Sequence, residues 1–110
     1  MLFSYGFIDN KAPRKVEGVK VVSDENGSML VWLLNEKAYD DEMNSPHRFV
    51  VYRFGKKEKV DIENSARIVA ITANPFYRIP AGTEGEFVYV VTVLDRMQNE
   101  STGVKCKVKL

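Results

Sequence analysis

Short runs rich in valine and aromatic residues, separated by turn residues, are the feature that most constrains how this chain folds. The longest is FVYVVTVLD at 87–95, and the run at 47–54 carries the same residue types. Such runs favour β-strands over helices. Turn signals lie between them, such as Asn26-Gly27, whose glycine supplies the positive backbone φ of a tight reversal. The predicted strands are residues 16–22, 28–35, 47–54, 67–72, 76–79, 87–95 and 102–110.

This strand pattern predicts an all-β fold: a seven-stranded antiparallel Greek-key sandwich of the immunoglobulin-like kind. The 110 residues correspond to one domain. Residues 12–110 are predicted to form the sandwich, and residues 1–11 a linker or the end of a preceding domain. The predicted core consists of Trp32, Leu30, Leu34, Phe49, Val51, Tyr89, Val91 and Val93.

Charge and hydropathy exclude several classes of partner. The chain has 16 basic and 15 acidic residues and a formal net charge of +1, so no strong field directs it to nucleic acid or to an anionic membrane. No segment approaches the roughly 18–20 apolar residues of a membrane span. Residues 1–8 are apolar but lack the basic start and small-residue cleavage site of a signal peptide, and they are more typical of the cut end of a longer chain.

Residues suited to catalysis or metal binding are few and scattered. Glycosidases need two carboxylates that face each other across a sugar. Asp40, Asp41 and Glu42 are instead neighbours in one polar loop, which we expect to be solvated. His47 is the only histidine and Cys106 the only cysteine, so neither has a second soft ligand at useful spacing. Cys106 lies in an alternating run, which predicts a buried strand position.

Four polar residues after the run at 87–95 raise the question of calcium binding. Asp95, Asn99, Glu100 and Ser101 do not follow the alternating spacing of a calcium loop. We expect them to shape a turn, with Asn99 in the left-handed φ region and Asp95 accepting backbone N–H groups. The sequence therefore predicts no catalytic residue, no metal site and no cofactor.

Several features in order resemble a fibronectin type III domain, over roughly residues 12–110. Pro13 precedes the first strand, Trp32 lies within the second, and residues 49–53 read FVVYR. The run at 88–101 reads VYVVTVLDRMQNES. The resemblance implies that Trp32 is the core tryptophan and that the hydroxyl of Tyr89 bonds backbone in the preceding corner.

The same strings are similar to the C-terminal sandwich of bacterial glycosyl-hydrolase-like proteins, in which it follows a (β/α)-barrel. Val93 stands where that pattern has alanine. The resemblance implies a non-catalytic accessory module that packs against or spaces the catalytic domain of the same chain. It also implies an extracellular, periplasmic or cell-surface location within a larger secreted protein.

Two predicted neighbouring strands are apolar on both faces, which is unusual for a sandwich. If Phe49, Val51 and Tyr89 face the core, the alternate residues form an apolar patch on the outer face. Such patches usually mark contact surfaces. The patch either packs against a neighbouring domain or is shielded by residues 1–8 or by the loop that follows the run at 47–54. The candidate interdomain residues are Val50, Tyr52, Phe54, Val88, Val90 and Leu94.

The alternative function is carbohydrate binding or adhesion through exposed aromatic rings. Aromatic rings stack on sugar faces, and tyrosine adds a polar group. Such a module needs two or three coplanar exposed rings and would take a polysaccharide as its partner. The candidate stacking residues are Tyr39, Tyr52, Phe76 and Tyr77, with Tyr5 as a further ring.

Overall fold

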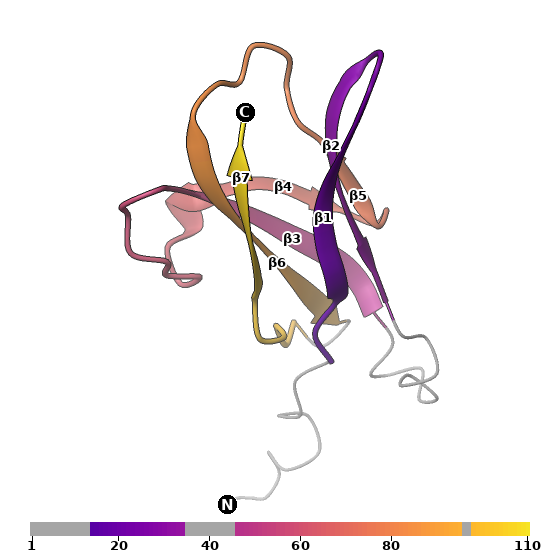
Figure 1. Cartoon of the computed structure of the whole chain (residues 1–110). Coiled ribbons are helices and arrows are strands. Elements are labelled where there is room, and N and C mark those ends of the chain that lie inside the picture. The colour runs from indigo at the N-terminus through magenta and orange to yellow at the C-terminus, as the bar shows by residue number, and fades with distance from the viewer. Residues whose placement is uncertain (1–13, 35–45, 96–97) are drawn as a thin grey trace, which may run out of the picture.

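The computed structural model describes residues 14–34, 46–95 and 98–110. In these residues the chain forms two antiparallel sheets that pack face to face (Figure 1). One sheet has three strands in the order β1-β2-β5, and the other has four in the order β4-β3-β6-β7. The predicted all-β sandwich is confirmed. The elements are β1 Glu17–Asp24, β2 Gly27–Leu33, β3 Pro46–Gly55, the 3-10 helix η4 Ser65–Arg67, β4 Ile68–Thr72, β5 Phe76–Arg78, β6 Glu86–Asp95 and β7 Val104–Lys109.

The first hairpin follows directly from its turn residues. Gly27 has a φ of 119°, and the side chain of Asp24 accepts the backbone N–H of Asn26 at 2.8 Å. Earlier in β1, Gly18 has a φ of 62° at a bulge where the register against β2 shifts. Both positions need a backbone that residues with a Cβ rarely adopt.

The core between the sheets is the predicted one. Leu30, Val51 and Tyr89 are fully buried there, and the ring of Trp32 meets that of Phe49 edge-on with centroids 5.4 Å apart. All eight predicted core residues belong to this cluster, although Leu34 is only partly buried. Because side chains alternate between the two faces of β2, β3 and β6, every second residue of these strands points into the core between the sheets.

One hydrogen bond that the resemblance implied is absent. The hydroxyl of Tyr89 is buried and bonds no backbone group among the described residues. The guanidinium of Arg53 lies close to it. The side chain points between the sheets, where the rings of Tyr77 and Phe87 surround it at centroid distances of 6.4 and 6.3 Å.

The larger sheet has a second apolar cluster on its outer face, here called the outer cluster. It consists of Val50, Tyr52, Phe54, Val88 and Val90, with Val60, Ile62, Ile68 and Leu94 packed against them.

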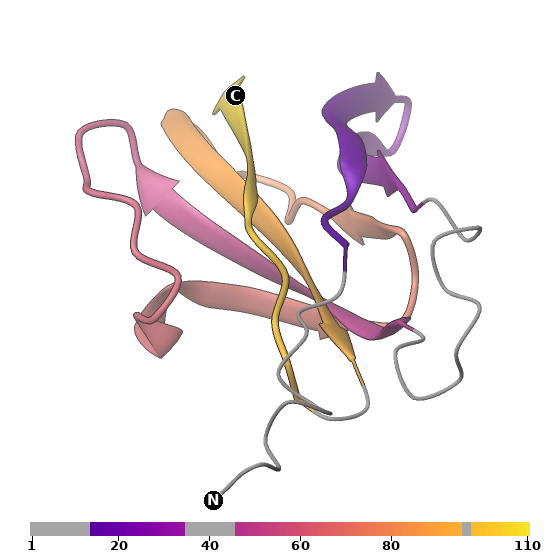
Figure 2. The same ribbon diagram turned by 90° about the horizontal axis from the view of Figure 1, so that it is seen from below.

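The structure shows one of the two arrangements that the sequence left open for this face. Its five central side chains are 1–9% exposed, because Val60 and Ile62 of the connection between β3 and β4 lie over them. Figure 2 shows this connection on the side of the larger sheet away from β1 and β2. The loop shielding that the sequence left open is thus the arrangement found, and the six candidate interdomain residues do not form an open surface.

The segment after β6 completes the cover. A Cβ added to Gly103 would lie 2.5 Å from Cγ1 of Val90 and 3.6 Å from Cγ2 of Ile62, so the backbone here rests directly on the cluster. Glu100 closes one side, since its carboxylate accepts the hydroxyls of Tyr52 and Thr92, each at 2.5 Å. The outer cluster is therefore a second sealed core.

Candidate interaction surface

The outer face of the three-stranded sheet is apolar and open, and we call it the open face. Along β2, the buried Leu30 and Trp32 alternate with Met29, Val31 and Leu33, which face away from the core. Leu33 is 69% exposed and Val31 half-buried. The register places further apolar residues beside them on both neighbouring strands. The open face consists of Val22, Met29, Val31, Leu33 and Phe76.

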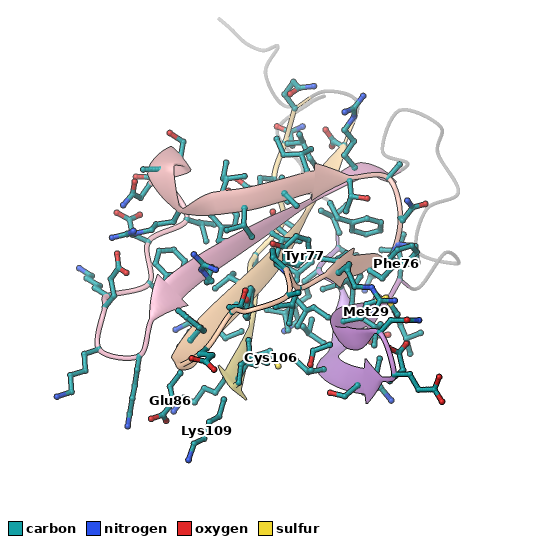
Figure 3. All side chains as sticks on the ribbon, turned by 90° about the horizontal axis from the view of Figure 1, so that it is seen from above. Met29, Phe76, Tyr77, Glu86, Cys106 and Lys109 are labelled. Carbon is teal, nitrogen blue, oxygen red and sulfur yellow. The ribbon has the colours of Figure 1, made fainter. Side chains whose placement is uncertain are left out.

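Cross-strand pairing makes the open face continuous rather than scattered. Val22 of β1 pairs with Met29, and Val31 pairs with Phe76 of β5. Phe76 is 42% and Val22 is 38% exposed. Figure 3 shows Met29 and Phe76 on the adjacent strands β2 and β5. Single exposed apolar residues need no explanation, but a contiguous set marks a contact surface.

Charged residues border the open face. Lys20 pairs with Val31 from the β1 side, and Arg78 pairs with Met29 from the β5 side. Nη1 of Arg78 lies 3.5 Å from Oδ1 of Asp24, and both side chains are well exposed. An apolar centre within a charged rim is the usual anatomy of a protein interface. An exposed pair of this kind adds little stability.

The three predicted sugar-stacking rings within the described residues do not come together. Tyr52 is 2% exposed, and its hydroxyl is bound to Glu100 inside the outer cluster. Phe76 and Tyr77 are successive residues of β5, so they face opposite sides of the sheet (Figure 3). Tyr77 packs inward against the core, and only Phe76 remains exposed. Tyr39 and Tyr5 lie outside the described residues.

The other residues singled out in the sequence have structural surroundings. Asp95 is fully buried, and its carboxylate accepts the backbone N–H of Asn99 at 2.9 Å, as predicted for a turn. The positive φ of 66° is at Gln98 and not at Asn99, so that part of the prediction is wrong. Asp40, Asp41 and Glu42 lie outside the described residues, as does the side chain of His47.

Cys106 and the buried tyrosines show the effect of burial on acidity. Cys106 is half-buried and packs against the inner core, and burial raises the pKa of its thiol. Burial likewise raises the pKa of Tyr77 and of Tyr89. Arg53 has a smaller opposing effect, through its charge at Tyr77 and, at Tyr89, through hydrogen bonding and then its charge. Burial, and then the hydrogen bond to Glu100, raises the pKa of Tyr52. These are structural shifts that keep the phenols and the thiol neutral.

Two further searches concern the described part of the chain. It holds no group of three or more His, Cys, Asp or Glu side chains placed to share a metal ion. It also has no helix long and apolar enough to cross a membrane.

Comparison with known proteins gives no family assignment. The chain matches no known protein family, and no curated protein sequence is significantly similar to it.

Proposed function

We propose that the chain is a non-catalytic accessory module of the fibronectin type III kind in a larger secreted bacterial glycoside-hydrolase-like protein, and that it braces a neighbouring domain. The observation that carries the proposal is the open face. On one side of the sandwich the chain itself covers the outer cluster, while the other side presents five contiguous apolar residues with Leu33 69% exposed.

The strand order supports the fibronectin type III part of the proposal. The resemblance implies that the strands at 47–54 and 87–95 are neighbours in one sheet, and β3 does pair with β6 over its whole length. The core tryptophan also lies where the resemblance implies, at the centre of the inner cluster. A fold hosts many functions, so the role itself rests on the surface and on the resemblance together.

The position of the open face favours a partner that precedes the module. Leu33 pairs with Glu17, the first residue of β1, at the end of the sandwich opposite the C-terminus (Figure 1). A domain attached ahead of β1 is thereby tethered beside the most exposed apolar residue. Tethering raises the effective concentration of the partner, so a modest patch suffices for a stable contact.

Carbohydrate binding by stacked rings is less well supported. It needs at least two coplanar exposed rings, and among the described residues only Phe76 is an exposed ring. A single ring with aliphatic neighbours fits a protein surface better than a sugar chain.

The test uses the gene product that contains this module together with the domain preceding it. Calorimetry would measure the melting temperature of the module in that protein and in isolation. We expect Leu33→Lys with Phe76→Lys to lower the melting temperature in the two-domain protein and to leave the isolated module within about 0.5 kcal/mol of the wild type. Ile71→Lys is the matched control, because Ile71 is 51% exposed but belongs to β4 on the other sheet.

Two results would overturn the bracing role. One is a module whose melting temperature is the same with and without the preceding domain, or a gene that encodes no such domain. The other is retardation of the isolated module by a polysaccharide in affinity electrophoresis that Phe76→Lys abolishes, which would instead establish the carbohydrate-binding alternative.

A further inference from the structure

An arginine occupies an inward-facing position near the end of the larger sheet. Arg53 of β3 pairs with Tyr89 of β6, and it alternates with the outward-facing Tyr52 and Phe54. Its side chain therefore lies on the same side of the sheet as Val51 in the inner core. A charge at such a position is uncommon, because removing it from water is costly unless it is paired.

Aromatic groups surround the guanidinium of Arg53. Its Cζ lies 4.9 Å from the centre of the Phe87 ring. It is close enough to Tyr89 and Tyr77 to lower the pKa of both hydroxyls against the larger effect of burial, at Tyr89 through hydrogen bonding and then charge, and at Tyr77 through charge. A cation over an aromatic face offsets part of the cost of burial, typically about 0.5–2 kcal/mol, and neutralises no charge.

Arg53 has no carboxylate partner among the described residues. The salt bridges of this part of the chain join Lys56 to Glu86, Arg67 to Glu58 and Arg78 to Asp24. The acidic residue that lines the same cavity, Glu58, has other partners, because its carboxylate binds Nε of Arg67 and accepts the backbone N–H of Gly55 at 3.0 Å. Five N–H donors of a half-buried guanidinium are thus left without an acidic acceptor from this region.

The arginine lines a cavity of about 270 Å³ at the end of β3. Arg67 and Phe87 form other parts of its wall, together with Val69 and the carboxylate of Glu58. Two guanidiniums against one carboxylate leave the cavity with an excess of one positive charge. A volume of this size suits a single small ring rather than a drug-sized molecule.

We propose that this cavity binds a carboxylate-bearing sugar, a uronic acid unit of an acidic polysaccharide, through the guanidinium of Arg53. A guanidinium presents parallel N–H donors that match the two oxygens of a carboxylate. The mixed polar and aromatic wall fits a hydroxylated ring better than an aliphatic acid. The inference is independent of the bracing role, because the cavity lies at the end of the larger sheet and the open face belongs to the smaller one.

The test is a titration of the isolated chain with D-glucuronate and D-galacturonate, followed by two-dimensional NMR of the backbone amides and the arginine Nε–Hε groups. We expect saturable shifts confined to the cavity residues, with a dissociation constant on the order of 1 mM for a monosaccharide. Arg53→Met should weaken binding at least about tenfold, and Arg53→Lys should weaken it by less. Arg78→Met, on the other sheet, is the control and should leave the affinity unchanged.

Neutral glucose and acetate complete the design. Equal binding of glucose, or unaltered uronate binding by Arg53→Met and Arg53→Lys, would overturn the assignment of Arg53. Equal binding of acetate would overturn the uronic acid assignment, since the ring would then add nothing. No saturable shift at about 50 mM of either uronate would overturn the site altogether. None of these results bears on the open face, whose test is the melting temperature of the two-domain protein.

Discussion

Gly103→Ala is the sharpest test of the sealed outer cluster. The added Cβ would come 2.5 Å from Cγ1 of Val90, whereas carbon atoms in contact prefer about 3.5–4.0 Å. Val90 is 1% exposed and β-branched, so its side chain has no other rotamer into open space. The methyl would also touch Ile62 and Thr92, each at 3.6 Å. Relief therefore requires the backbone at 103 to move away from the sheet.

The expected cost follows from overpacking a closed cluster. Inserting a methyl into a well-packed core typically costs about 1–3 kcal/mol. For a domain of this size, that corresponds to a fall in melting temperature of about 4–12 °C. Gly103 does not have a left-handed φ, so no backbone strain adds to the steric effect.

Urea unfolding of four variants measures the effect. Gly55→Ala is the control, because its Cβ would meet only Glu58 at an ordinary 3.7 Å, and we expect it to be neutral or to stabilise by up to about 1 kcal/mol. Val90→Ala alone should cost about 2 kcal/mol by leaving a cavity. In the double variant the new methyl enters that cavity. Its loss of unfolding free energy should therefore be smaller than the sum of the two single losses, by about 1 kcal/mol or more. Equal stability of Gly103→Ala and Gly55→Ala, or strict additivity with Val90→Ala, would refute the packing of residue 103 on the cluster.

Two further predictions concern the inner core and the phenol of the outer cluster. Trp32→Ala should lower the free energy of unfolding by about 3–5 kcal/mol, and an unchanged urea midpoint would show that the core is misplaced. Burial and Glu100 raise the pKa of Tyr52 above its ordinary value of 10.0, so the stability from the neutral phenol is present below pH 10 and is lost as the pH rises above it. Unfolding measured from pH 8 to 11 should therefore show a steeper decline above pH 10 for the wild type than for Tyr52→Phe, and parallel curves would contradict the raised pKa.

The sequence predicts the strands and the inner core well because both depend on local signals. Alternation places Leu30 and Trp32 on the inner face of one sheet and Val51 on the inner face of the other. Turn residues such as Asn26-Gly27 place the strand ends within a few residues. The prediction fails where a face is closed by a distant segment. Val60 and Ile62 lie in a charged stretch that reads as a turn, and nothing local indicates that they fold back over β3 and β6.

The open face had a detectable signal. The run SMLVWLLN at 28–35 is apolar on both faces, as are the runs at 47–54 and 87–95. The pattern indicates that both sheets have an apolar outer face. It does not indicate which of these two faces the chain itself covers. That depends on the lengths and apolar content of the connections. The connection at 56–67 carries two apolar residues to the larger sheet, while β1 and β2 are joined by the tight turn at Glu25 and Asn26, which reaches no face.

The contrast between the two outer faces explains why exposure on one of them points to a partner. Three elements cover the outer cluster: the connection at 56–67, Gly103 packed against Val90, and the carboxylate of Glu100, which accepts two hydroxyls. Ordering that much chain costs conformational entropy, and the stability of a small domain is only a few kcal/mol. On the smaller sheet no described segment forms such a cover over the row of apolar side chains, and charged residues border it. An apolar surface of this kind promotes aggregation when nothing covers it. In the bracing role that we propose, a neighbouring domain tethered beside Leu33 would remove that liability without further chain, and the same contact would fix the module in place.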